Sequence, residues 1–81
     1  MRQYIATFFS HFGAVRFERL CSARGWQAQL RPVPRALSSS CGTCVYFTAE
    51  HLGAMHELCT PELEQLVLAD AGYELLYKAE D

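Results

Sequence analysis

The chain lacks a long hydrophobic run and lacks an excess of positive charge. Its apolar stretches fall well short of the roughly 18 residues that a transmembrane helix needs, and it does not open with a charged segment followed by an apolar one. We therefore expect neither a membrane span nor a signal peptide. A formal net charge of −2 at pH 7 provides no basic surface for nucleic acid. These absences favour a cytoplasmic protein without membrane or nucleic-acid partners.

Several catalytic signatures are also missing. The sequence contains no glycine-rich phosphate loop, no serine-histidine-carboxylate set in a recognisable context and no paired carboxylates, and we expect no cofactor. What is present is an ordinary globular composition, with 51% hydrophobic and 20% charged residues. A length of 81 residues is too short for two hydrophobic cores, so we expect a single domain over residues 1–81.

The pattern of apolar residues predicts six elements in the order strand, helix, strand, strand, helix, strand. The predicted strands are Tyr4–Phe9, Trp26–Arg31, Val45–Thr48 and Tyr73–Lys78. The first helix begins after the N-cap Ser10 and ends at Gly25. The second helical region covers Glu50–Cys59 and resumes after a break at Pro61, where the helical spacing is carried by Leu63, Leu66, Val67 and Ala71.

This order of elements predicts an α+β fold of the ferredoxin-like type, β-α-β-β-α-β. Such a fold has a four-stranded antiparallel sheet in the spatial order 4-1-3-2, with the helices on one face. Pro32 and Pro34 place the second strand at an edge, as this order also requires. The first and second strands then run in the same direction, so the loop after the second strand shares an end of the sheet with the helix start. We expect His11 to lie near Cys41 and Cys44.

The candidate chemistry lies in the segment 34–44, PRALSSSCGTC, which holds two of the four cysteines. A thiol with a pKa of about 8.5 is only about 3% thiolate at neutral pH, so a nucleophilic cysteine needs positive surroundings. The positive end of the first helix offers one contribution. The groups that add to it belong to His11, Arg35, Ser38, Ser39 and Ser40. Gly42 allows a tight turn, so that Cys44 can act as the resolving thiol for Cys41.

Metal binding and simple packing stay open as alternatives for the cysteines. His56 and Cys59 stand three positions apart on the predicted second helix, so Cys41, Cys44, His56 and Cys59 form a possible zinc set. We favour packing for Cys59, solvation for His56 and burial for Cys21. Two other functions follow from these alternatives: a zinc-stabilised interaction module, and a regulatory module that pairs through its sheet. A homo-oligomer would form through the sheet face or edge.

The chain resembles a family of small bacterial proteins described as selenium/sulfur (Se/S) carrier protein-like. The resemblance rests on Tyr4–Phe8 followed by Ser10, on Arg16–Glu18, and above all on Pro32–Cys44. It implies that Cys41 carries a persulfide or selenium adduct between a donor, such as a cysteine desulfurase, and an acceptor enzyme. The protein is then a transfer partner rather than a self-sufficient enzyme. After Glu50 this chain departs from its relatives, which reach their last strand in fewer residues through one helix.

Overall fold

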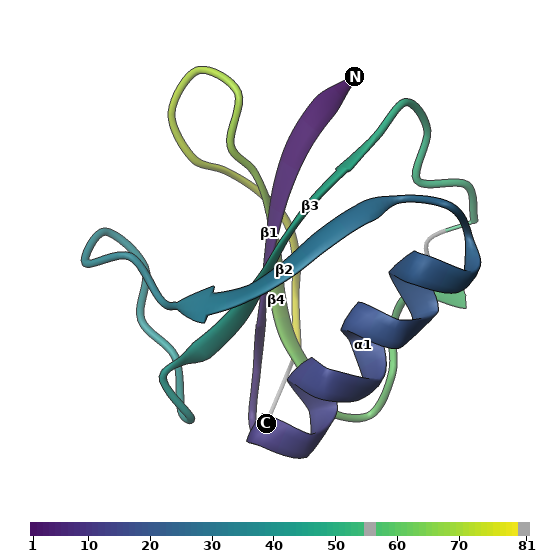
Figure 1. Cartoon of the computed structure of the whole chain (residues 1–81). Coiled ribbons are helices and arrows are strands. Elements are labelled where there is room, and N and C mark those ends of the chain that lie inside the picture. Colours follow the sequence, from purple (N-terminus) through teal and green to yellow (C-terminus); the bar gives the residue numbers. More distant parts are fainter. Residues whose placement is uncertain (55–56, 80–81) are drawn as a thin grey trace.

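The structure is a computed structural model that describes residues 1–54 and 57–79. In this part of the chain, one α-helix packs on a five-stranded antiparallel sheet (Figure 1). The elements are β1 (Arg2–Phe8), α1 (His11–Ala23), β2 (Gln27–Pro32), β3 (Thr43–Ala49), β4 (Leu63–Leu68) and β5 (Glu74–Lys78). The strands follow the spatial order β2-β3-β1-β4-β5, so β1 lies at the centre. The described residues contain no helix long and apolar enough to cross a membrane.

The first helix forms as its sequence predicts. Ser10 has extended backbone dihedrals, and its hydroxyl accepts a hydrogen bond from the Gly13 amide at 3.1 Å, which satisfies a free donor of the first turn. Gly25 follows the last turn with a φ of +79°, a left-handed conformation that glycine adopts without strain. The helix buries Ala14, Phe17 and Cys21 against the sheet.

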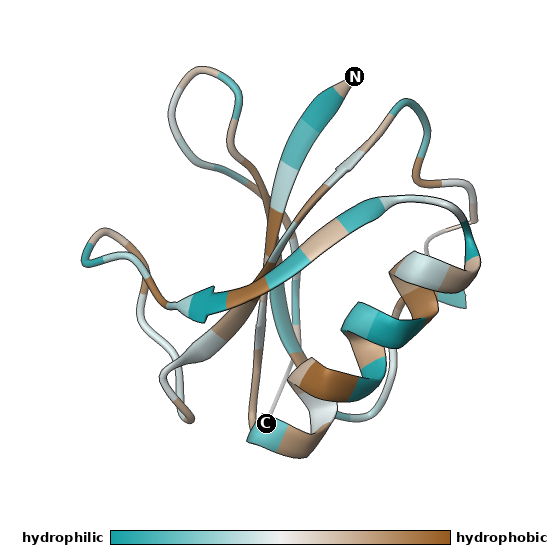
Figure 2. Ribbon diagram, viewed as in Figure 1, coloured by the Kyte–Doolittle hydropathy of each residue, from teal (hydrophilic) through white to brown (hydrophobic). Residues whose placement is uncertain are grey.

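The core lies between α1 and the sheet, and Phe47 of β3 is at its centre. The Phe47 ring packs against Tyr4 at 5.3 Å, Phe17 at 5.4 Å and Trp26 at 5.5 Å between ring centroids. These contacts connect β1, α1 and the start of β2 through one side chain. Figure 2 shows brown, hydrophobic segments where the strands cross in this view, and others on α1 and in the connecting loops.

The ferredoxin-like prediction is right in its first half and wrong in its second. The strand order β2-β3-β1 is the predicted one, with β2 at an edge. The segment 63–68, predicted as helix, is the strand β4, and it takes the place beside β1 that was expected for the last strand. The last strand, β5, pairs with β4 at the other edge. The sheet therefore has five strands instead of four.

The predicted helix at Glu50–Cys59 is not found either. Its described residues, 50–54 and 57–59, form no α-helix, and Met55 and His56 lie outside the described residues. The side chain of Leu58 is nevertheless fully buried in the core. The apolar spacing in this segment therefore reflects single contacts of a loop with the core rather than one face of a helix.

A β-bulge explains why β4 reads as a helix in the sequence. Leu63 and Gln65 pair with adjacent residues of β1, so Glu64 is an extra residue in β4 without a partner opposite it. The bulge brings Leu63 and Leu66 onto the same core face although they are three positions apart. A spacing of three is the signature of a helix, whereas a regular strand alternates with a period of two.

Candidate functional site

The loop that carries Cys41, residues 33–42, closes the hairpin between β2 and β3. The Val33 amide donates to the Gly42 carbonyl at 3.1 Å, which continues the ladder of the two strands by one step. A turn from Pro34 to Leu37 follows, closed by a hydrogen bond of 3.0 Å between them. Gly42 has a φ of +76°, so this last loop residue needs the left-handed conformation that other residues rarely adopt. We call this segment the Cys41 loop.

The Cys41 loop lies next to the start of α1, as the strand directions predict. The His11 Nδ1 atom is 3.4 Å from the Thr43 Oγ1 atom, which directly follows the loop. The Ser39 hydroxyl donates to the Phe8 carbonyl at the end of β1, at 3.1 Å. The expected neighbourhood of the helix start and the loop is thus confirmed by contacts from both sides of the loop.

Side chains of β4 fasten the loop to the sheet. The Glu64 carboxylate accepts from the Ser40 amide at 3.2 Å and from the Ser40 hydroxyl at 3.0 Å. The Gln65 amide group donates to the Ser38 carbonyl at 2.9 Å. The hydroxyls of Ser39 and Ser40 are therefore committed to protein acceptors. The backbone amides of Cys41 and Gly42 donate to no other protein group among the described residues.

The thiols of Cys41 and Cys44 differ in exposure. Cys41 is half-buried, packs against the edge of the core and donates its thiol hydrogen to the Thr43 carbonyl at a sulfur–oxygen distance of 3.4 Å. Cys44 is fully buried and donates to the Pro32 carbonyl at 3.6 Å. Burial raises the pKa of Cys44 to about 11, the nearby Arg31 acts in the opposite direction, and Cys41 adds a smaller increase. At pH 7 about one Cys44 side chain in 10,000 is a thiolate.

Arg31 is a neighbour of this site that the sequence analysis missed. It pairs directly with Cys44 across β2 and β3, and its guanidinium lies 5.1 Å from the centre of the Tyr46 ring. Arg35, which was expected to help the thiols, lies in the exposed turn and makes no ion pair or hydrogen bond among the described residues. Counting the hairpin register backward from the loop would have identified Arg31, because residues 31 and 44 are equally far from the turn.

The four residues of the possible zinc set do not form a metal site in the part of the chain that the structure describes. His56 lies outside it, and the described residues contain no group of three histidine, cysteine, aspartate or glutamate side chains that could hold a metal ion. Cys59 packs against the edge of the core. Cys21 is fully buried on α1, and burial raises its pKa to about 12, with a further increase from Glu18. Neither Cys59 nor Cys21 forms a metal site with Cys41 and Cys44 among the described residues.

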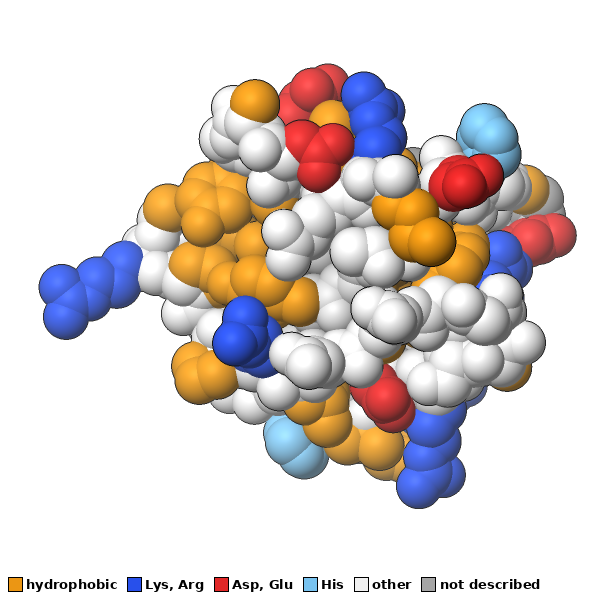
Figure 3. All heavy atoms as spheres, turned by 45° about the horizontal axis from the view of Figure 1, so that its top comes forward, with side chains coloured by type: hydrophobic (Ala, Val, Ile, Leu, Met, Phe, Trp, Pro, Cys, Tyr) orange, Lys and Arg blue, Asp and Glu red, His pale blue; other side chains and the backbone are white. Residues whose placement is uncertain are grey.

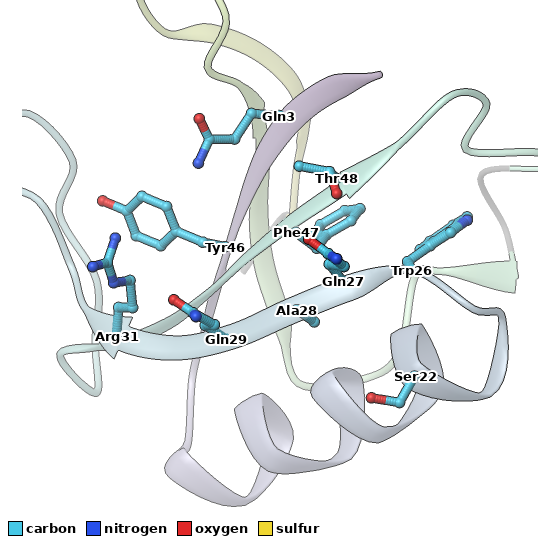
Figure 4. Close-up of a pocket in the computed structure, with 10 residues that line it drawn as sticks. All are labelled: Gln3, Ser22, Trp26, Gln27, Ala28, Gln29, Arg31, Tyr46, Phe47 and Thr48. Atoms are coloured by element: carbon cyan, nitrogen blue, oxygen red, sulfur yellow. The ribbon is translucent and has the colours of Figure 1, made fainter.

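A groove of about 630 Å³ lies elsewhere, along β2 and β3 (Figure 4). Figure 4 shows Arg31 and Tyr46 together at one end and Trp26 at the other. Glutamine side chains from β1 and β2 line much of the space between them, and these are Gln3, Gln27 and Gln29. None of the four cysteines lines this groove, so it is separate from the Cys41 loop.

The fold and the loop together define a small α+β protein with one half-exposed thiol on a fastened hairpin loop. Residues 3–65 match the family described as "Putative Se/S carrier protein-like". Because the match covers more than three quarters of the chain, the protein belongs to this family, and the resemblance seen in its residues is confirmed. The end of β4 and all of β5 lie beyond the matched residues. No curated protein and no solved structure matches the chain.

Proposed function

We propose that the protein carries sulfur or selenium on Cys41 and passes it from a donor enzyme to an acceptor enzyme in the cytoplasm. Membership of the Se/S carrier protein-like family supports a carrier role. The observation that selects Cys41 is its environment: it is the half-exposed thiol of the loop, whereas Cys44 is fully buried with a raised pKa. A carrier thiol must reach two partners in turn, so it needs exposure on a surface rather than a deep pocket.

The transfer uses two displacement steps. In the first, the Cys41 thiolate attacks the terminal sulfur of a persulfide on the donor's cysteine, the donor's S–S bond breaks, and the donor's cysteine leaves as a thiolate. In the second, a nucleophile of the acceptor attacks the terminal sulfur on Cys41, and Cys41 leaves as a thiolate. In each step one bond to the transferred sulfur or selenium forms as another breaks, so no external oxidant or reductant is needed.

The surroundings of Cys41 support a negative sulfur in a limited way. The start of α1 contributes the positive end of a helix dipole, and His11 lies beside Thr43 at this end of the sheet. The amides of Cys41 and Gly42 are available as donors. We expect Arg35, on the exposed turn, to meet the surface of a donor or acceptor rather than the sulfur itself. A resolving role for Cys44 requires the loop to open, because Cys44 is buried.

The test is sulfur loading from a cysteine desulfurase and cysteine under anaerobic conditions, followed by mass spectrometry of the intact protein and its peptides. We expect the mass of one added sulfur atom on Cys41. Cys41→Ser should abolish loading, whereas Cys44→Ser and Cys21→Ser, as matched controls, should retain it. Equal loading of the Cys41→Ser variant, or loading that follows Cys44, would refute the proposal. The same experiment with a selenium donor separates the two elements.

A second candidate function is association through the C-terminal edge of the sheet. The side chains of Leu75 and Leu76 on the edge strand β5 are 53% and 36% exposed, and β5 lies beyond the residues that match the family. Figure 3 shows that orange, hydrophobic side chains gather on one part of the surface in that view. Leu75→Lys should reduce self-association in sedimentation experiments if this edge forms a homo-oligomer, and should have no effect on a monomer.

A further inference from the structure

Glu64 occupies an unusual place in the sheet. As the extra residue of the β-bulge it has no partner on β1, although its neighbours Leu63 and Gln65 both do. A bulge re-aims the side chain of the extra residue and breaks the regular alternation of faces. In this protein the re-aimed side chain reaches the Cys41 loop, which comes from a different part of the chain.

Three donors converge on the Glu64 carboxylate. The Ser40 amide is 3.2 Å from one carboxylate oxygen, and the Thr7 hydroxyl is 3.4 Å from the same oxygen. The Ser40 hydroxyl is 3.0 Å from the other oxygen. Both oxygens are therefore used, and two of the three bonds hold the residue that directly precedes Cys41. Hydrogen bonds to an ionised acceptor are stronger than those between neutral groups, and this set links the loop to both β1 and β4.

We propose that Glu64 is a positioning residue that holds the Cys41 loop in one conformation and thereby limits the reactivity of the Cys41 thiol. Its importance for sulfur or selenium transfer rests on the proposed carrier function. By fixing Ser40, the carboxylate fixes where Cys41 packs against the core and in which direction its sulfur points. A protein donor gains from this order because the nucleophile is already oriented, whereas a small reagent is hindered by it because the thiol stays half-buried.

The experiment compares Glu64→Gln and Glu64→Ala with the natural protein. Peptide mass spectrometry follows the alkylation of Cys41 by iodoacetamide, and hydrogen exchange follows the Ser40 amide. The Gln side chain keeps one acceptor oxygen, so we expect it to accelerate Cys41 alkylation about fivefold, the equivalent of one lost hydrogen bond. The Ala side chain keeps none and should accelerate alkylation further. Exchange at Ser40 should rise in the same order.

Two controls separate positioning from general destabilisation. Glu62→Gln alters a carboxylate two positions earlier that pairs with Arg16 of α1 at 3.3 Å, and it should leave Cys41 alkylation unchanged. Ser40→Ala removes the bond to one carboxylate oxygen only, so its effect and that of Glu64→Gln should be less than additive. A change confined to overall stability would affect Cys41 alkylation equally in the Glu62 and Glu64 variants.

Transfer from a persulfide donor provides the opposite readout. We expect Glu64→Ala to lower kcat for loading of Cys41 several-fold with little change in KM, while alkylation becomes faster. Unchanged alkylation and exchange in both Glu64 variants would overturn the positioning role. If the natural protein accepts no sulfur at all, the carrier proposal fails, but alkylation and exchange still decide the role of Glu64.

Discussion

Cys41 and Cys44 are three positions apart in the sequence but lie in different physical environments. Cys41 lies in the loop, half-buried at the edge of the core. Cys44 lies in β3, paired with Thr7 of β1 on one side and with Arg31 of β2 on the other, and it is fully buried. The second thiol is fully buried in a strand paired on both sides, while the first lies half-buried in a tethered loop. Although Cys41 and Cys44 are close in the sequence, they are therefore not chemically equivalent.

The largest expected effect is the difference in reactivity between the two thiols. At pH 8 a thiol with a pKa of about 11 is about 0.1% thiolate, so Cys44 should react with iodoacetamide about 100-fold more slowly than an ordinary free cysteine. Of Cys41 and Cys44, Cys41 should be modified first. The rate at Cys44 should rise about tenfold per pH unit up to its pKa. Comparable rates for both cysteines in the folded protein would contradict the contrast described here.

The next effect is a loss of stability in alkaline solution. The pKa of Cys44 is raised from 9.0 to about 11, and that of Cys21 from 9.0 to about 12. As the pH rises above 9, the unfolded chain therefore loses these protons before the folded chain does. The stability from these thiols is fully present below pH 9. It is lost as the pH rises through about 11 for Cys44 and about 12 for Cys21. For Cys44 alone the loss is about 3 kcal/mol. Urea denaturation at pH 8, 9.5 and 10.5 measures it, and Cys44→Ala should flatten the decline.

Removal of each side chain should have a smaller effect on stability at neutral pH. Cys44→Ala removes a fully buried sulfur and leaves a small cavity in the sheet, so we expect a loss of about 1 kcal/mol in the free energy of unfolding. Cys41→Ala, in the half-buried loop, should cost clearly less. Urea denaturation of both variants at pH 7 provides the comparison. A larger loss of unfolding free energy for Cys41→Ala than for Cys44→Ala would show that Cys41 is the better packed of the two.

The smallest effect concerns the two arginines. Arg31 lowers the pKa of Cys44, so Arg31→Gln should raise this pKa further and slow the alkylation of Cys44 at pH 9 by about two- to threefold. Arg35→Gln serves as the matched control, because Arg35 lies in the exposed turn. The alkylation rate of Cys44 in the Arg35→Gln variant should equal that in the natural protein. An effect of Arg35→Gln as large as that of Arg31→Gln would contradict the assignment of Arg31 as the arginine that lowers the pKa of Cys44.

The first half of the fold could be predicted because its signals are local. Ser10 and Gly25 mark the two ends of α1, and the prolines after β2 exclude it from the centre of a sheet. The second half could not, because the bulge at Glu64 gives a strand the spacing of a helix. No neighbouring residue in the sequence signals this bulge. It forms where β4 meets β1, far away along the chain.

The candidate site divides in the same way. The thiol-bearing loop and its place near His11 follow from the sequence, since both depend on the motif itself and on the direction of adjacent strands. The roles of its serines do not follow, because Ser39 and Ser40 are bound to acceptors that the sequence does not indicate. Ser39 and Ser40 were chosen for their proximity to Cys41 in the sequence, which is a poor guide to hydrogen-bond partners.

By itself, the sequence determined the capped helix, the first three strands and the position of the cysteine loop, because caps, turns and alternation act over a few residues. Only the tertiary structure decided which thiol is exposed and which carboxylate holds the loop. Both depend on the pairing of β3 and β4 with β1, that is, on contacts between distant segments. The burial of Cys44 and the reach of Glu64 exist only once those strands have assembled.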